Sequence, residues 1–325
     1  MHLIMVGACY LDTILSVPHF PEQDAKLRAT SLNVRRGGNC GNGLEVLQQF
    51  LPPAPPSSSS SSSSSSLAPT LSLNPHLVTI LPSRQSAATA KVLSSFGPDT
   101  PVDLSHCIHR EDQAEAASSY IIHDQETGSR TIVNHNGLAE MTVDEFVGIA
   151  EAFKENEAET WWHFEGRIPE TLLECIQYIR RHLPRARISV EVEKPRRDGL
   201  RELAAEADVV FYSRSWAEGE GYTSSEACLT GEVGRTTRPS LLLCTWGARG
   251  ATALSLPSRK LLHITPASDR AVQIVDAVGA GDTFVAGMLY GLLCRAGDWD
   301  LHRMCRMDQT HAGMLPWVGV GGRFP

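Results

Sequence analysis

Positive charge is scarce in this chain of 325 residues, in which 29 Lys and Arg stand against 37 Asp and Glu for a formal charge of −8. Nucleic acids and anionic membranes attract concentrated Lys and Arg, so this balance argues against both as partners. It leaves room for a small anionic ligand, because a few well-placed groups can hold one.

Long apolar runs are also absent, and none could span a bilayer. Met1 to Val6 lacks a basic segment followed by a long apolar core, which predicts no secretory signal and a cytoplasmic protein. The eight cysteines form no C-x-x-C pair, and several lie in apolar runs, as is typical of reduced, buried thiols. This pattern argues against a disulfide framework and against a zinc site.

Metal-ligand motifs are equally hard to find. The nearest approach is His106-Cys107-x-His109, which lacks a fourth ligand nearby. We therefore expect no metal site built from protein side chains.

Most of the chain predicts an α/β fold. Apolar residues make up 42% of it, enough for a sizeable core, and short β-rich runs alternate with helical patterns. We expect one domain over residues 1–325, with a mostly parallel central sheet, helices on both faces and ligands at the carboxyl ends of the strands. The expected strands lie near 3–9, 77–81, 186–192, 208–213, 240–245 and 250–256. The expected helices lie near 39–50, 84–96, 142–157, 169–183, 197–207, 223–230 and 282–295.

Three regions depart from this alternation. Residues 10–36 and 106–137 carry polar, alternating stretches, which predict antiparallel strands in a small second sheet, a natural lid over a cleft. Residues 52–70 contain Pro-Pro-Ala-Pro-Pro and an unbroken serine run, so we expect a disordered surface loop there. That loop is either a tolerated insertion or a phosphorylated regulatory segment.

The glycine-rich turn at 279–284, Gly-Ala-Gly-Asp-Thr-Phe, is the most informative segment. Gly279 and Gly281 allow a tight turn, and the amides at the start of the following helix favour a phosphate or a phosphoryl transition state. Asp282 could accept a hydroxyl proton during phosphoryl transfer, or it could simply cap the helix. The segment is not a Walker A loop, because no Gly-Lys-Ser/Thr follows.

Together with other motifs in order along the chain, this turn resembles the signature of the phosphofructokinase-B (ribokinase-like) carbohydrate kinases, and most of all their ketohexokinase branch. The likeness covers about residues 3–50 and 105–295. The motifs are Val6-Gly7-x-x-x-Leu11-Asp12, Arg36-Gly37-Gly38-Asn39-x-x-Asn42, Gly128-x-Arg130-Thr131-Ile132-Val133, His163-Phe164-Glu165-Gly166-Arg167, Ser189-Val190-Glu191-Val192-Glu193-Lys194-Pro195-Arg196 and Asp208-Val209-Val210-Phe211.

The resemblance implies a sugar site at Asp12, Gly38, Asn39 and Asn42. A carboxylate accepts hydrogen bonds from sugar hydroxyls, and an amide both donates and accepts them. Taken alone, Asp12 could be an ordinary turn residue, and the two asparagines could be cap residues on a flexible turn.

The resemblance also implies nucleotide contacts, and it gives Gly279, Ala280 and Gly281 an anion-binding role beside Asp282. Arg130 matches an arginine that reaches the ATP phosphates, while Arg214 stands where ketohexokinases tend to carry a lysine. The loop with Trp246, Gly247 and Gly250 would lie under the nucleotide. The plainer alternatives are an exposed strand arginine and an ordinary hairpin turn.

The expected function is ATP-dependent phosphorylation of a hydroxymethyl group of a ketohexose, of the fructose to fructose 1-phosphate type. ATP would bring Mg²⁺ held mainly through its phosphates, with a monovalent cation and a homodimer through the lid left open by analogy. Two alternatives remain. One is a kinase of another sugar or a nucleoside, and the other is a non-catalytic sugar or nucleotide sensor, because residues 304–325 lack the family's closing helix.

Overall fold

The structure, a computed structural model, describes residues 1–51, 73–154, 159–236, 238–265 and 279–294. The insertion expected at 52–70, the strand-like run 274–278 before the glycine turn and the divergent segment 304–325 lie outside these residues. In the part that is described, no helix is long and apolar enough to cross a membrane.

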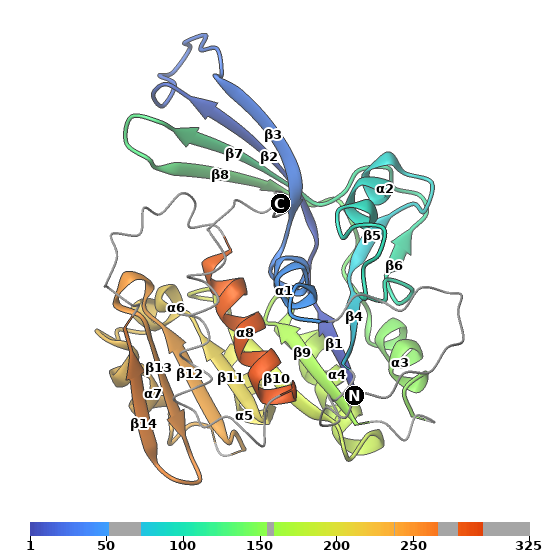
Figure 1. Cartoon of the computed structure of the whole chain (residues 1–325), viewed down its shortest axis with the longest axis vertical. Coiled ribbons are helices and arrows are strands. Elements are labelled where there is room, and N and C mark those ends of the chain that lie inside the picture. The colour runs from blue at the N-terminus through green and yellow to red at the C-terminus, as the bar shows by residue number, and fades with distance from the viewer. Residues whose placement is uncertain (52–72, 155–158, 237, 266–278, 295–325) are drawn as a thin grey trace, which may run out of the picture.

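An eight-stranded sheet forms the body, in the order β14-β13-β12-β11-β10-β9-β1-β4 (Figure 1). All its pairs are parallel except those of the β12-β13-β14 meander. The strands are β1 (His2–Val6), β4 (Asn74–Val78), β9 (Thr160–Glu165), β10 (Arg187–Val192), β11 (Val209–Tyr212), β12 (Leu241–Thr245), β13 (Ala251–Ser255) and β14 (Lys260–Ile264).

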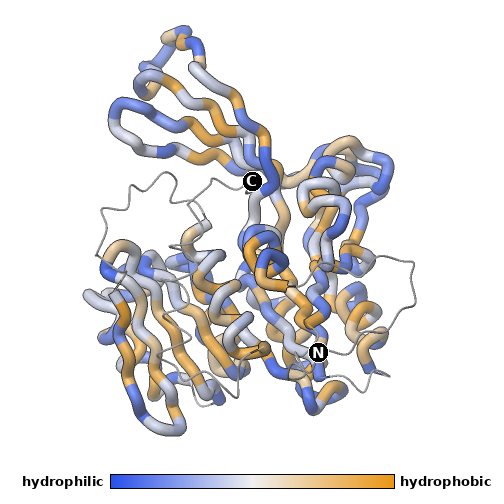
Figure 2. The backbone as a smooth tube through the Cα atoms, viewed as in Figure 1, coloured by the Kyte–Doolittle hydropathy of each residue, from blue (hydrophilic) through white to orange (hydrophobic). Residues whose placement is uncertain are grey.

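Helices cover both faces of this sheet, because its inner strands are apolar on both sides (Figure 2). α1, α2 and α8 bury one face, and α3, α4, α5, α6 and α7 bury the other. The expected fold class is therefore confirmed. The helices are α1 (Asn39–Gln48), α2 (Ala87–Ser94), α3 (Val143–Glu151), α4 (Pro169–His182), α5 (Leu200–Glu206), α6 (Arg214–Gly219), α7 (Ser225–Glu232) and α8 (Ala280–Cys294), with a 3₁₀ turn at Gly247–Arg249.

A separate four-stranded sheet projects from the body (Figure 1), in the order β3-β2-β7-β8. Its strands are β2 (Tyr10–Val17), β3 (Ser31–Gly37), β7 (Ser118–Asp124) and β8 (Arg130–His135). The outer pairs are antiparallel as expected, but the central β2–β7 pair is parallel. β6 (Ile108–Arg110), which we expected within this sheet, pairs instead with β5 (Ile80–Pro82).

The expected elements differ from the observed ones in a few places. β9, β14 and α6 were not among the expected strands and helices, although the Trp161-Trp162-His163 run has the apolar character of a buried strand. The expected strand at 77–81 is divided, because the chain leaves the large sheet after Val78 to form β5.

One face of the small sheet exposes a set of large apolar side chains. Leu15, Leu32, Tyr120 and Val133 lie on neighbouring strands in positions that share a face, opposite to the face of Ile121 and Ile132. The homodimer expected through this sheet stays a prediction, with which such a face is compatible.

Candidate active site

A cleft of about 480 Å³ opens at the carboxyl ends of β9, β10, β11 and β12, where ligands collect in parallel α/β sheets. The small sheet supplies Asp12, Ser119 and Asn134, and the start of α8 supplies residues 279–282. The structure brings together all eight residues expected at the sugar and phosphoryl-transfer sites: Asp12, Gly38, Asn39, Asn42, Gly279, Ala280, Gly281 and Asp282.

The backbone before α1 sets the position of the two asparagines. Gly38 precedes the helix with φ of 99°, which side-chain-bearing residues rarely adopt, and an added Cβ would lie 2.1 Å from the carbonyl oxygen of Ala8. Only glycine therefore fits this turn, which places Asn39 and Asn42 in the first turn of α1, facing the cleft.

A hydrogen bond joins the two helices that open into the cleft. Nδ2 of Asn42 donates to Oδ2 of Asp282 over 2.8 Å, and Oδ1 of Asn42 accepts from Nη1 of Arg36 over 3.2 Å. Arg36 is itself fixed by an ion pair with Glu45. The buried guanidinium therefore orients the amide, and the amide orients the carboxylate.

The start of α8 suits an anion. Gly279 has φ of 82° and lets the chain turn sharply into the helix, while Ala280 and Gly281 are exposed to the cleft. The first amides of a helix have no intrahelical acceptor and lie at the positive end of its dipole. Asp282 lies in this first turn, and its carboxylate is directed to Asn42.

Acidic residues line the floor of the cleft, and sequence reasoning did not single them out. Glu165 ends β9, Glu191 is the penultimate residue of β10, and Glu193 follows β10. All three stand in motifs quoted for the resemblance. Their position at the carboxyl ends of two strands is the signal that could have identified them as site residues. Nδ2 of Asn39 donates to Glu191 over 2.9 Å and to Glu193 over 3.1 Å. The backbone N–H of Ala8 donates to Glu165 over 2.8 Å.

These carboxyl groups are difficult to ionise together. Burial, followed by the charge of Glu191, raises the pKa of Asp282 to about 8, although the hydrogen bond from Asn42 opposes the rise. Burial and the charge of Glu193 raise the pKa of Glu191 to about 8, and burial and Glu191 raise that of Glu165 to about 7. The free site therefore holds protons at neutral pH, and binding of a cation would lower these pKa values and release the protons to solvent.

His163 supports this floor from within the core. Its Nε2 lies 2.9 Å from Glu191 and its Nδ1 lies 2.8 Å from the hydroxyl of Ser189. Burial lowers the pKa of His163 to about 3, so the contact joins a neutral imidazole to a carboxyl group. The histidine thus positions Glu191 without adding positive charge.

Asp12 is held by the small sheet. It is buried on β2, opposite Ser119 of β7, and burial raises its pKa while the hydrogen bond with Ser119 lowers it. Its position lets a carboxylate from the small sheet face the groups on α1 and α8 across the cleft.

The residues expected on the nucleotide side are not brought into the cleft that the described residues form. Arg130 begins β8 beside its hairpin turn, and Arg214 pairs with Glu218 over 2.7 Å at the start of α6. Trp246 is only 2% exposed and packs in the core, with Gly247 and Gly250 in the turn that follows. Thr245, one residue earlier, does line the cleft.

Three other cationic side chains do line the cleft, namely Arg167, Lys194 and Arg197. Arg167 pairs with Glu140 over 2.7 Å, Lys194 with Glu193 over 2.7 Å, and Nη1 of Arg197 donates to the carbonyl of Gly166 over 2.7 Å. Sequence reasoning missed them as site residues, although Arg167 and Lys194 stand in the quoted motifs.

The two sheets and the cleft between them define a ribokinase-like α/β protein, and comparison with solved structures agrees. Ribokinase from Giardia lamblia matches with a TM-score of 0.72 at 15% identity over 96% of this chain and 91% of that one. Phosphofructokinase-2 from Escherichia coli, in complex with fructose-6-phosphate, matches with 0.66 at 16% identity over 95% and 91%. At these identities the likeness shows the fold alone.

Sequence comparison identifies the family. A model described as pfkB family carbohydrate kinase matches residues 98–314. Ketohexokinase from Mus musculus is 31% identical over 300 residues, which cover 89% of this chain and 88% of that protein. The chain belongs to the pfkB family of carbohydrate kinases, whose members transfer a phosphoryl group to an alcohol, and the resemblance seen in the motifs is confirmed.

The raised carboxyl pKa values predict how stability depends on pH. Glu165 titrates near 7 in the folded chain and near its ordinary 4.5 when unfolded, so the folded state binds more protons between these values. Its contribution to stability is present at low pH and is lost as pH rises through about 7. We expect Glu165→Gln, which keeps an acceptor for the N–H of Ala8, to gain stability relative to wild type from pH 5 to pH 8.

Chemical denaturation of both proteins at pH 5 and pH 8 measures the free energy of unfolding. The neutral, buried His163 contributes to this free energy with the opposite pH dependence, but it is present in both proteins, so its contribution cancels in the difference. Glu115→Gln, in an exposed loop, is the matched control and should run parallel to wild type. Parallel curves for Glu165→Gln would show that Glu165 ionises normally in the folded protein.

Proposed function

We propose that this chain is an ATP-dependent sugar kinase that phosphorylates a hydroxymethyl group of a ketohexose, of the fructose to fructose 1-phosphate type. One observation carries the proposal. Asp282, at the start of α8, lies in one cleft with Asn42 and Asp12, so a proton acceptor and polyol-binding groups face the same small volume. The similarity to mouse ketohexokinase supports the choice of sugar.

Asp282 acts as the general base. The acceptor hydroxyl donates a hydrogen bond to its carboxylate, and its proton passes to that carboxylate as the hydroxyl oxygen attacks the γ-phosphorus of ATP. The new O–P bond forms as the bond from the γ-phosphorus to the β,γ-bridging oxygen breaks, and ADP leaves with that electron pair. Asn42 holds the carboxylate toward the acceptor throughout.

Positioning and electrostatics supply the rest of the rate. The amides of Gly279, Ala280 and Gly281 stabilise charge on the migrating phosphoryl group. Asp12 and Asn39 accept and donate hydrogen bonds to the other sugar hydroxyls. The small sheet, which contributes Asp12, Ser119 and Asn134 to the cleft, is the lid that closes over them.

The donor set of the cleft fits a magnesium–nucleotide complex. Lys194 and Arg197 line the cleft and could contact phosphates, and Arg130 would join them as the lid closes. Mg²⁺ prefers oxygen ligands and keeps several waters, so phosphate oxygens would hold most of it, with Glu191 and Glu193 nearby. When bound, the ion would supply positive charge against that of the phosphates.

A coupled ADP-release assay across ketoses, aldoses and nucleosides tests the acceptor. We expect fructose to be the best acceptor among them, with the product phosphate on the C1 oxygen by NMR. Turnover of adenosine without fructose would assign a nucleoside kinase instead. Ligand binding by calorimetry without any phosphoryl transfer would make the protein a sensor.

Replacement of the base separates chemistry from binding. Asp282→Asn keeps the shape and an acceptor oxygen but cannot take a proton, so kcat should fall by about 10²- to 10⁴-fold while sugar affinity by calorimetry stays close to wild type. Asp12→Asn is the contrasting variant and should act mainly on the KM for sugar. Near-normal turnover by Asp282→Asn would reject its role as base.

Asn42 should tune the base through its hydrogen bond. The pH profile of kcat/KM reports the free enzyme and should rise with pH through about 8, as Asp282 loses its proton. Asn42→Ala removes a hydrogen bond that favours the carboxylate, so the same limb should move to higher pH. Gln48→Ala, on the same helix and away from the cleft, should leave the limb in place. An unmoved limb in Asn42→Ala would mean that Asn42 does not act on the base.

A further inference from the structure

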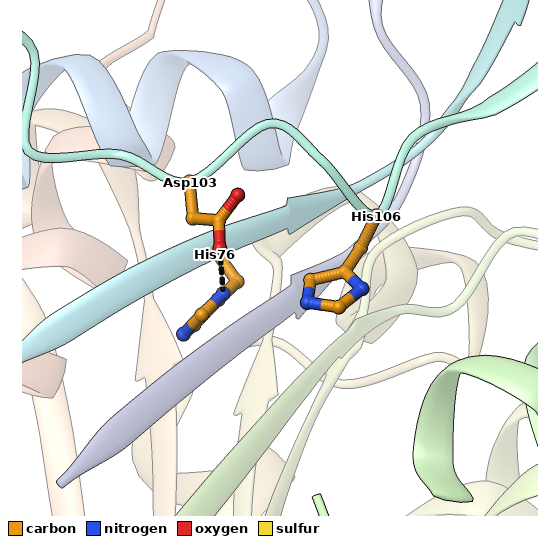
Figure 3. A group of neighbouring side chains, drawn as sticks. All are labelled: His76, Asp103 and His106. Carbon is orange, nitrogen blue, oxygen red and sulfur yellow. Dashed lines mark ion pairs between the residues drawn. The ribbon is translucent and has the colours of Figure 1, made fainter. Parts of the chain in front are cut away.

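A second cluster of titratable side chains lies outside the cleft. His76 on β4 meets Asp103 and His106 from the loop that follows α2 (Figure 3). His2 on β1 contacts His76 from the neighbouring strand. None of the four residues lines the cleft. The ring of Phe153 packs against all three imidazoles, with centroids 5.1–5.6 Å away, and closes the cluster on one side.

Three of these side chains point their ligand atoms at a common space. One ligand atom each from His76, Asp103 and His106 lies within 4.8 Å of the other two. His76 is buried and the other two are half-buried. Bonds of 2.0–2.2 Å hold the donor atoms around one metal ion about 3–4 Å apart, so the three side chains would need to close in by up to about 1 Å to ligate a common ion.

The hydrogen bonds of His76 leave one of its nitrogens for this space. Nε2 of His76 lies 2.8 Å from Nδ1 of His2, a contact that needs one proton between the two nitrogens. Nδ1 of His76 is buried and lies 3.2 Å from Oδ2 of Asp103, yet it makes no hydrogen bond of acceptable geometry. The distances fit either tautomer of His76. In the tautomer that donates through Nε2 to His2, Nδ1 presents a lone pair to the carboxylate, and a cation between them would relieve the repulsion.

We propose that His76, Asp103 and His106 bind one divalent transition-metal ion of the Zn²⁺ type. Two imidazole nitrogens and one carboxylate oxygen are donors that suit zinc and disfavour Mg²⁺ and Ca²⁺, which take oxygen ligands. Three protein ligands leave a fourth position for water on the solvent side. His2 would act through His76. Its Nδ1 would accept the Nε2–H of His76, and this hydrogen bond would fix the His76 tautomer that ligates the ion through Nδ1.

The backbone around Asp103 holds this arrangement before any ion arrives. The N–H of Asp103 donates to Pro75 over 2.8 Å, and its carbonyl accepts from the N–H of Leu77 over 3.0 Å, so the residue extends the edge of β4 opposite His76. The N–H of Ser105 donates to Oδ1 of Asp103 over 2.8 Å and leaves Oδ2 for the cluster. The ion would thus pin the 103–106 loop to the edge strand of the large sheet.

The structure also explains why the His106-Cys107-x-His109 motif is a poor guide. The thiol of Cys107 points to the carbonyl of Leu77 at 3.6 Å, and Nδ1 of His109 lies 3.0 Å from the carbonyl of Pro82. Only His106 of the motif faces the cluster, and its partners come from elsewhere in the chain.

Zinc titration of the full-length protein tests the proposal. The protein is stripped with EDTA, dialysed into excess Mg²⁺, and titrated with ZnCl₂ against a chromophoric chelator. We expect one zinc ion per chain, a rise in melting temperature on zinc addition, and visible d–d absorption of a four- or five-coordinate ion when Co²⁺ replaces zinc. His106→Ala and Asp103→Asn should each weaken zinc binding by about 100-fold or more, and zinc should no longer raise their melting temperatures.

His109→Ala is the matched control, because it removes a nearby histidine of the same motif from outside the cluster, and it should bind zinc like wild type. Circular dichroism confirms that each variant folds, and Asp103→Asn keeps an acceptor for Ser105. Absence of stoichiometric binding to wild type would show a plain hydrogen-bonded His–Asp cluster and overturn the proposal. So would zinc retained at full affinity by both His106→Ala and Asp103→Asn, which would place the ion elsewhere in the chain.

Discussion

The hydrogen bond between Asn42 and Asp282 joins residues 240 positions apart and brings the starts of α1 and α8 to one point. Each helix follows a glycine with positive φ, and each presents its first turn to the cleft. Behind it, the buried guanidinium of Arg36 donates to Oδ1 of Asn42 and so orients the amide toward Asp282. A short chain of contacts that begins in the core therefore positions the carboxylate at the centre of the cleft.

The same cleft places like charges close together, which is costly in an unliganded protein. The charges of Glu191 and Glu165 raise the pKa of Asp282, the charge of Glu191 raises that of Glu165, and burial raises all three. Such a set costs stability in the free protein, whereas a site that binds a divalent cation gains from it, because the positive charge of the ion lets the carboxyl groups ionise. The cluster of carboxyl groups therefore lowers the free energy of unfolding of the free protein and favours binding of a cation.

Sequence reasoning reached the parts of this site that local pattern encodes. The glycine turn before a helix drew attention to Asp282 from residue type and position. Asp12, Asn39 and Asn42 could equally be turn or cap residues on those grounds, and only the resemblance to the carbohydrate kinases marked them as sugar-site residues. The residues expected on the nucleotide side stay predictions, and Trp246 shows why they are harder to place. Thr245, the last residue of β12, lines the cleft, whereas Trp246, one residue further on, is buried. The parallel β2–β7 pair was equally hidden, because α1, β4 and α2 come between its strands in the chain.

The cluster of His76, Asp103 and His106 resembles the cleft in one respect and differs from it in the type of donor. In both places, groups with lone pairs are held near one another, and a proton or a cation reduces their repulsion. The cleft is open and its acidic groups are carboxyl groups, which suit a cation that arrives and leaves with a nucleotide. The cluster of His76, Asp103 and His106 packs against Phe153 at the edge of β4, and two of its three donors are imidazoles, which suit a more tightly held transition-metal ion. Together with His2, the residues of this cluster come from three separate segments of the chain, so no motif of regularly spaced residues in the sequence indicates it.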